Sequence, residues 1–432
     1  MITGLILRPE KQGGGTVDNK QPVKESSLPF NPPQVPTVKT PVRGLRFDFN
    51  QGLRVLVPKG NYFIRFIDRD AALSVYESAA SGVLASSAKR YFVNFRLEVY
   101  EMPDAGERKG DKAKTGGRKP KLVFAHDYKA EGRPVMIRFA GQEKSNVFAW
   151  IPYAEAFRKK HRCRLYVRLD DEYIDVLQKG YPKIRFLGTD EKDPEDCYAT
   201  YYVDLSAPED NRLQPVDWRV VGIQAYCACL LGVDDGETRP RILPSSDRAG
   251  ENRPEEPYVC IAVQAGTQRG NWNNAQGWID TVAYLKSIGY RVLCIDRERI
   301  TENGLFGNTI PFGAEDFTGE RPLQERVDLI AGARFFIGVA CEFLWLAWGT
   351  GVPVILITGA TAPGTEFKTP YRVQQFHTCN SCVNEQRNEH INDASDACPH
   401  YHGADREFEC TRCITPGSVR NTVGRLRSDL SV

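Results

Sequence analysis

The chain has almost no excess charge of either sign, because its 57 basic and 55 acidic side chains leave a net charge of +2 over 432 residues. Such a balance provides no overall field that would attract nucleic acid. One local stretch, 108–121, is strongly basic, but it contains no aromatic side chain on which a base could stack. We therefore predict a solvated hairpin loop at 108–121 and no nucleic-acid partner.

Long hydrophobic runs are also missing. The apolar start at 1–7 is followed immediately by Arg8, Pro9, Glu10 and Lys11. It is too short for a signal peptide or a membrane-spanning helix. We expect a protein that has no transmembrane segment and stays in the cytoplasm.

Histidine is scarce, yet four of the six histidines fall within 377–402, and five of the twelve cysteines fall in the last 54 residues. These five follow the pattern C-x2-C, a 15-residue gap, C, an 11-residue gap and C-x2-C. Cysteine pairs at this spacing are typical of tetrahedral metal sites. The five are Cys379, Cys382, Cys398, Cys410 and Cys413.

Four thiolates complete a tetrahedral shell, so we predict that Cys379, Cys382, Cys398 and Cys410 hold one metal ion and that Cys413 is spare. A mixed shell of sulfur and histidine stays open, as does the choice between zinc and iron. Disulfides are disfavoured, because nothing in the chain indicates secretion and cytosolic thiols stay reduced. The end of the chain is therefore predicted to contain a metal finger.

The hydrophobic pattern changes along the chain. From Leu45 to Phe139, short runs alternate between apolar and polar residues, as in an antiparallel β domain. Beyond Val135, expected strands and helices alternate, and the alternation resumes at Tyr258 after a polar stretch at 245–256. This order predicts two α/β halves with parallel sheets, in which ligands bind outside the carboxyl ends of the strands.

These patterns divide the chain into six expected segments. The start is rich in Pro, Gly, Lys and Ser and cannot bury enough apolar surface to order itself. The segments are a disordered tail at 1–43, an N-terminal antiparallel β domain at 44–134, a first Rossmann-like domain at 135–250, a second Rossmann-like domain at 257–375, a metal finger at 376–414 and a C-terminal helix at 415–432.

Several motifs carry a resemblance to a known family. They include Trp272-Asn273-Asn274, the loop from Gly313 to Gly319, Cys398-Pro399-His400 and Trp150-Ile151-Pro152-Tyr153. With these motifs the chain resembles the bacterial autotransporter heptosyltransferases, the TibC-type enzymes, over nearly everything after residue 43. The resemblance implies an α/β protein with a GT-B glycosyltransferase fold, an N-terminal β domain and a C-terminal four-cysteine metal finger that binds iron rather than zinc.

The resemblance also implies an activity and partners. Members of this family transfer heptose from ADP-heptose to Ser or Thr of an autotransporter passenger. We therefore expect a cytoplasmic bacterial protein that acts on an autotransporter passenger before export. We also expect a ring-shaped homo-oligomer, such as a dodecamer.

The second Rossmann-like domain is expected to bind the nucleotide sugar. Asp296 ends a strand, and Glu315 and Asp316 lie in a loop bounded by glycines, so their carboxylates could reach ribose hydroxyls; helix-capping or solvated carboxylates are the alternative. The expected donor contacts are Thr267, Trp272, Asp296, Glu315, Asp316, Thr318 and Glu342.

At three positions the chain departs from what the resemblance implies. The family's general base is an Asp, and Asn146 stands there, although an amide cannot accept a proton. A phosphate-binding Lys is replaced by Gly270, next to which Arg269 is a candidate substitute. A glycine-containing turn that approaches the diphosphate is replaced by 341–343, where Glu342 would repel that diphosphate.

The departures lead to two hypotheses. In the first, the chain is an O-heptosyltransferase with impaired catalysis, or with a changed donor or a base recruited from Glu143 or Asp170. In the second, it is a non-catalytic, iron-binding accessory that binds and positions the autotransporter. Because the cysteines and core motifs are retained, we expect the protein to keep its fold, its metal binding and its partner binding even if catalysis is lost.

Overall fold

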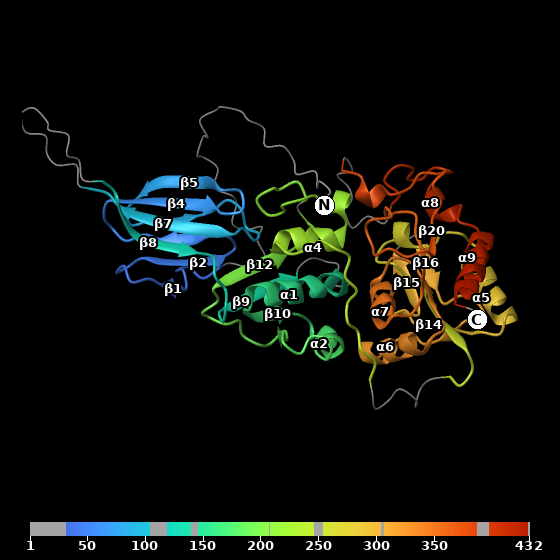
Figure 1. Ribbon diagram of the computed structural model, residues 1–432. Helices are drawn as coiled ribbons and strands as arrows, with labels where there is room; N and C mark the ends of the chain where they lie inside the picture. The colour runs from blue at the N-terminus through green and yellow to red at the C-terminus, as the bar shows by residue number, and fades with distance from the viewer. Residues whose placement is uncertain are drawn as a thin grey trace, which may run out of the picture.

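The structure, a computed structural model, describes residues 32–103, 119–139, 146–206, 208–245, 254–303, 306–386 and 397–430. These residues form an N-terminal antiparallel sheet, a central α/β unit and a C-terminal α/β unit (Figure 1). Most of the basic stretch expected to form a hairpin loop lies outside the described residues, as does the alternative base Glu143. Across the described ranges, no helix is both long and apolar enough to cross a membrane.

The N-terminal sheet has four antiparallel strands in the order β5-β4-β7-β8. One face is apolar, and its Ile64, Phe66, Leu97 and Val99 are at most 1% exposed, because successive side chains of a strand point to opposite faces. The predicted N-terminal antiparallel sheet is confirmed. Its strands are β4 (Tyr62–Asp68), β5 (Leu73–Ala80), β7 (Phe95–Glu101) and β8 (Lys121–Asp127).

The central unit contains an eight-stranded sheet in the order β11-β10-β9-β12-β2-β3-β6, with β1 paired to β2. The strands from β11 to β2 are parallel, and β3 and β6 are antiparallel additions. The sheet therefore includes three strands from the segment that we expected to form a separate N-terminal domain. The strands are β2 (Arg46–Asn50), β3 (Arg54–Leu56), β6 (Leu84–Ser86), β9 (Pro134–Phe139), β10 (Arg164–Arg168), β11 (Arg185–Leu187) and β12 (Ala199–Val203).

The ordered part of the chain begins earlier than expected. β1 (Val38–Lys39) pairs with β2, and the Thr37 hydroxyl donates to the Cys197 carbonyl at 2.7 Å. The Arg54 guanidinium donates to the Pro33 carbonyl at 2.8 Å. The prediction of a disordered tail up to residue 43 is therefore wrong for the residues from Pro33 onward. Although this segment has few apolar side chains to bury, its backbone and side chains form hydrogen bonds with the central unit.

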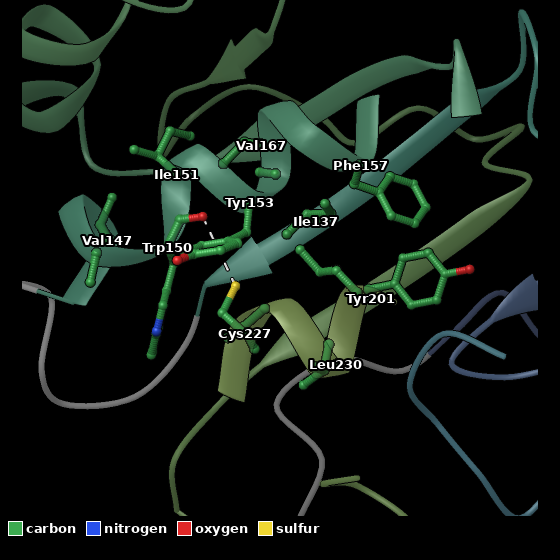
Figure 2. Packing of buried hydrophobic residues seen from close by; sticks show 14 of the residues in the cluster. Ile137, Val147, Trp150, Ile151, Tyr153, Phe157, Val167, Tyr201, Cys227 and Leu230 are labelled. Carbon is green, nitrogen blue, oxygen red and sulfur yellow. Dashed lines mark hydrogen bonds between the residues drawn. The ribbon is translucent and has the colours of Figure 1, made fainter. Parts of the chain in front are cut away.

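Helix α1 (Val147–His161) packs against the central sheet through its buried side chains. Figure 2 shows its Trp150 and Phe157 in an apolar cluster with Ile137 of β9 and Cys227. This packing fixes the start of α1, next to the expected base position. The other helices of the unit are α2 (Asp171–Leu177), α3 (Trp218–Val221) and α4 (Ile223–Leu231).

The C-terminal unit is built on a parallel sheet in the order β17-β14-β13-β18-β19-β20. Counted within this sheet, the strand order is 3-2-1-4-5-6, which is the order of a dinucleotide-binding Rossmann fold. The two predicted α/β halves are thus confirmed. The strands are β13 (Tyr258–Ala262), β14 (Arg291–Cys294), β17 (Glu315–Asp316), β18 (Phe336–Gly338), β19 (Val354–Ile357) and β20 (Arg372–Val373).

Helices cover the C-terminal sheet, and a short hairpin and three short turns complete the unit. The helices are α5 (Gly277–Ser287), α6 (Leu323–Gly332), α7 (Glu342–Thr350) and α9 (Pro416–Asp429). The hairpin is β15 (Ile300–Asn303) with β16 (Phe306–Thr309), and the turns are η3 (Gln268–Gly270), η4 (Cys382–Asn384) and α8 (Glu409–Arg412).

Candidate functional site

A crevice is expected in the C-terminal unit where the strand order reverses, beyond the carboxyl ends of β13 and β18. After β13 the chain continues through Val263 to Thr267, and after β18 it enters α7 at Glu342. Two of the predicted donor contacts, Thr267 and Glu342, therefore follow the two strands that flank this point. What binds there depends on the side chains around them.

Glu342 is the first residue of α7, and Arg297 holds its carboxylate. Arg297 Nη2 donates to Glu342 Oε2 at 2.9 Å, and Arg297 Nε donates to Oε1. These hydrogen bonds are the main reason why the pKa of Arg297 is raised. Bidentate pairs between charged groups are among the stronger hydrogen-bonded contacts in proteins. Because Glu342 is only 11% exposed, the start of α7 is occupied by the chain's own anion.

Arg297 also contacts the central unit. It donates to the Glu172 carboxylate through Nη1 at 3.0 Å and Nη2 at 3.2 Å. The neighbouring Tyr173 hydroxyl donates to Glu342 Oε2 at 3.4 Å. Burial, followed by the charge of Glu342, raises the pKa of Tyr173, so this hydroxyl keeps its proton. We call Glu172, Tyr173, Arg297 and Glu342 the interdomain cluster.

Asn146 immediately precedes α1 in the central unit. Its side chain is 5% exposed, and it makes no side-chain capping hydrogen bond to the helix. A carboxamide can donate and accept hydrogen bonds, but it does not take up a proton at neutral pH. Asp170, one of the alternative bases, lies at the start of α2, two residues before Glu172 of the interdomain cluster. Position 146 therefore offers hydrogen bonding without base chemistry.

Asp296 is 1% exposed and holds the loop that follows β13. Its oxygens accept the backbone N–H groups of Val263 at 2.9 Å and Gln264 at 3.2 Å. Burial raises the pKa of Asp296 to about 6, although these hydrogen bonds oppose the shift. The structure thus places Asp296 near the crevice, where both carboxylate oxygens already bind the backbone.

The other acidic residues predicted to contact the nucleotide sugar, Glu315 and Asp316, lie on β17, the edge strand of the sheet. Arg291 binds the Glu315 carboxylate at 2.8 and 2.5 Å, which lowers the pKa of Glu315. The Asp316 carboxylate accepts the Thr318 hydroxyl at 2.6 Å and backbone N–H at 3.0 Å, which lowers the pKa of Asp316. Two strands separate β17 from β18, so the structure does not bring these residues together with Glu342.

The Trp-Asn-Asn motif docks the finger onto the C-terminal unit. Trp272 is 4% exposed, and its Nε1 donates to the Ile414 carbonyl at 3.0 Å. Asn273 Nδ2 donates to the Thr411 hydroxyl at 2.9 Å, and Asn274 Nδ2 donates to the Ile414 carbonyl at 3.2 Å. Sequence reasoning missed these partners, which lie about 140 residues away along the chain. The motif therefore has a structural role beside any contact to the donor.

Gly270 cannot simply be replaced by the lysine that the resemblance implies. A Cβ atom at this position would lie 2.7 Å from the Ala265 Cβ, so the loop would have to shift. Arg269, the candidate substitute, is 7% exposed, and its charge is close enough to Cys382 to act on the pKa of that thiol. Its guanidinium thus lies near the finger.

The four predicted metal ligands lie close to one another. Cys382, Cys398 and Cys410 are each 7% exposed. Burial and then the neighbouring thiols of Cys382, Cys379 and Cys398 raise the pKa of Cys410 to about 12. Cys413 is exposed, as expected of a spare cysteine. A shell of four soft sulfur donors would suit zinc or iron.

The arrangement is not that of a formed metal site. Among the residues that the structure describes, no three His, Cys, Asp or Glu side chains are grouped so that they could hold a metal ion. His400 contacts Glu385 at 2.8 Å and His402 contacts Glu407 at 3.1 Å, so these imidazoles bind carboxylates. The choice between a shell of four sulfurs and a mixed shell stays open, and the metal finger stays a prediction.

Comparison with known proteins identifies relatives over most of the chain. A family model described as the N-terminal domain of glycosyltransferase TibC matches residues 41–103. The autotransporter heptosyltransferase Aah of Escherichia coli is 40% identical over 402 residues, which are 93% of this chain and 98% of Aah. The inactive autotransporter heptosyltransferase BimC of Burkholderia thailandensis is 33% identical over 399 residues, covering 91% of this chain and 88% of BimC.

Solved structures agree with these relatives. The iron-containing dodecameric glycosyltransferase TibC from enterotoxigenic E. coli H10407 superposes with a TM-score of 0.83 at 38% identity, over 93% of this chain and 100% of the TibC chain. TibC in complex with ADP-D-beta-D-heptose gives the same TM-score and coverage. With this identity over nearly its whole length, the chain belongs to the autotransporter heptosyltransferase family.

Proposed function

We propose that this protein acts on a bacterial autotransporter passenger as a heptosyltransferase family member whose own sugar transfer is weakened or lost. The observation that carries the proposal is the Glu342 carboxylate, bound by Arg297 at the start of α7. The start of a helix that follows a Rossmann strand is a favoured place for a phosphate group. Here that place already contains a carboxylate.

Electrostatics explains why transfer would suffer. The diphosphate of ADP-heptose is anionic, and Glu342 repels it, while Arg297 is already engaged by Glu342 and Glu172. Asn146 adds a second defect, since an amide cannot take the proton of the acceptor hydroxyl. Removing one electrostatic group at a reacting centre typically slows a reaction about 10²- to 10³-fold. The two defects together would leave transfer slow or undetectable.

The other parts of the proposal concern the assembly. The two α/β units would be the halves of a GT-B fold, and the four predicted cysteine ligands of the finger would bind iron, with zinc as the alternative. A homo-oligomer, ring-shaped and dodecameric like TibC, would act in the bacterial cytoplasm. The similarity to TibC over nearly the whole chain supports these statements.

A non-catalytic accessory that binds and positions the autotransporter is the second candidate function. The buried cysteines and the hydrogen bonds from Trp272 and Asn273 to the finger favour it, because a docked finger does not depend on a working donor site. The 33% identity to BimC, a relative named as inactive, supports the same reading.

The mass of a co-expressed passenger tests the proposed function. We expect the unmodified protein to leave the passenger mass unchanged, and Asn146→Asp combined with Glu342→Gly to add heptose increments. Glu325→Gln, which removes a carboxylate paired with Arg321 away from the crevice, is the control and should behave like the unmodified protein. Heptose on the passenger with the unmodified protein would show ordinary transferase activity. Gly270→Lys is unsuitable as a further test variant, because a side chain at this position would collide with Ala265.

A further inference from the structure

The interdomain cluster joins the two α/β units at one end of their interface. Glu172 and Tyr173 come from α2 of the central unit, while Arg297 and Glu342 come from the C-terminal unit. In Figure 1, α2, α6 and α7 lie at the lower side of this interface, and α4 lies at its upper side. The two ends are built differently.

The upper end combines close backbone contacts with side-chain hydrogen bonds, such as those from Asn384 Nδ2 to the Arg219 carbonyl at 2.9 Å and from Gln386 Nε2 to Asp217 Oδ2 at 2.9 Å. A Cβ atom at Gly222 would lie 2.0 Å from the Gly364 carbonyl oxygen, so the two chain segments touch. The Ile223 N–H points to the Thr365 carbonyl at 3.5 Å. Hinges between domains are typically formed by a few residues of this kind at the ends of helices or loops. The upper end is therefore suited to act as a pivot.

The lower end combines apolar packing with charge, because Tyr173 of α2, Val327 of α6 and Phe343 of α7 belong to one buried cluster. One guanidinium, that of Arg297, pairs with two carboxylates, and each carboxylate comes from a different unit. The Arg297–Glu342 pair lies within the C-terminal unit, and the Glu342 side chain is 11% exposed. The Arg297–Glu172 pair crosses the interface, and the Glu172 side chain is 37% exposed. Water and salt weaken an exposed pair more than a buried one. The Arg297–Glu172 pair is therefore the one that would break first.

We propose that the interdomain cluster is an ionic latch that adds to the apolar packing between the two α/β units and helps to hold them together without any ligand between them. Arg297 stays bound to Glu342, and this end of the interface closes or opens as the Arg297–Glu172 pair forms or breaks. Binding energy from a ligand is then not needed to bring the units together. The proposal concerns the contact between the units, and it does not depend on whether the protein transfers sugar.

Hydrogen–deuterium exchange of the full chain tests the latch. Glu172→Lys replaces the crossing carboxylate by a cation that repels Arg297, and the readout is exchange at the start of α7, in the other unit, where the sequence is unchanged. We expect exchange there to be roughly two- to fivefold faster, the effect of losing one partly exposed ion pair. Asp175→Lys is the control, because it makes the same charge change on the same helix at an exposed position.

Two results would overturn the latch. One is unchanged exchange at the start of α7 in Glu172→Lys, and the other is equal acceleration in the Asp175→Lys control. If Glu172→Lys does not fold, Glu172→Gln is measured with the same expectation. The unmodified protein should also show faster exchange at the start of α7 in about 1 M salt, which screens exposed pairs, whereas Glu172→Gln should respond little. An equal salt response in both proteins would contradict the latch as well.

Discussion

The buried carboxylate of Asp296 gives the molecule a pH-dependent stability. Its pKa rises from 3.8 to about 6 on folding. The unfolded chain therefore releases this proton at lower pH than the folded chain, and the free energy of unfolding falls as pH rises from about 4 to about 6. The shift corresponds to about 3 kcal/mol. We expect Asp296→Asn to lose this pH dependence when urea unfolding is compared at about pH 4 and pH 7.

The control for this prediction is Asp280→Asn, which changes an exposed carboxylate on α5 and should keep the pH dependence of the unmodified protein. If the free energy of unfolding depends on pH in the same way in Asp296→Asn and in the unmodified protein, Asp296 is not the source of this pH dependence.

Gly277 shows how a single glycine permits the Trp-Asn-Asn motif to dock the finger. A Cβ atom at Gly277 would lie 2.7 Å from the Trp272 ring. We expect Gly277→Ala to destabilise the protein by about 1 to 3 kcal/mol, as overpacking typically does. Gly424→Ala in α9 is the matched control, because open space surrounds that position and alanine favours a helix by about 1 kcal/mol. Thermal unfolding measures the stability of both variants. Equal melting temperatures for Gly277→Ala and Gly424→Ala would contradict the expected overpacking against Trp272.

At the scale of elements, the N-terminal segment before β2 contributes to stability. A chain shortened to begin at Gly44 loses the β1 pairing and the hydrogen bond from Thr37 to Cys197. We expect a loss of about 1 to 2 kcal/mol, which lowers the melting temperature by several degrees. A chain that begins at Pro32 should melt like the full chain. Identical melting of both shortened chains would show that the segment does not pack.

The finger makes a prediction of its own. If four sulfurs bind one metal ion, Cys382→Ser removes a buried ligand and should lower the bound metal to less than half of the unmodified content. Cys413→Ser changes an exposed cysteine and should leave the content unchanged. Elemental analysis of protein grown without added metal measures both. A metal-free unmodified protein would refute the site, and an equal loss in Cys413→Ser would refute the choice of ligands.

Local periodicity predicted the elements that depend on local sequence. The alternating strands and helices expected beyond Val135 and again from Tyr258 match the structure, because their apolar spacing is set within a few residues. The parallel pairing of β2 with β12 joins Phe49 to Ala199, and no local pattern specifies such a partner. The same limit applies to Trp272, whose hydrogen-bond partner Ile414 becomes a neighbour only in the folded chain.

For the whole molecule, the candidate site lies between two units that already touch. The resemblance predicted that residues 146 and 342 matter, and the structure adds that Glu342 is bound by Arg297, which also binds Glu172. The sequence could not predict this cluster, because its members come from two units and are separated by up to 170 residues. Donor binding is therefore expected to depend on one carboxylate, that of Glu342, which occupies the start of α7.

Calorimetric titration of ADP-heptose tests this central claim most directly. The unmodified protein should bind the nucleotide sugar weakly or not at all. Glu342→Gly removes the repelling carboxylate and leaves Arg297 paired with Glu172 alone, so it should bind at least about tenfold more tightly, a difference of about 1.4 kcal/mol. The control Glu325→Gln should bind like the unmodified protein. Micromolar binding by the unmodified protein, with no gain in Glu342→Gly, would contradict the account.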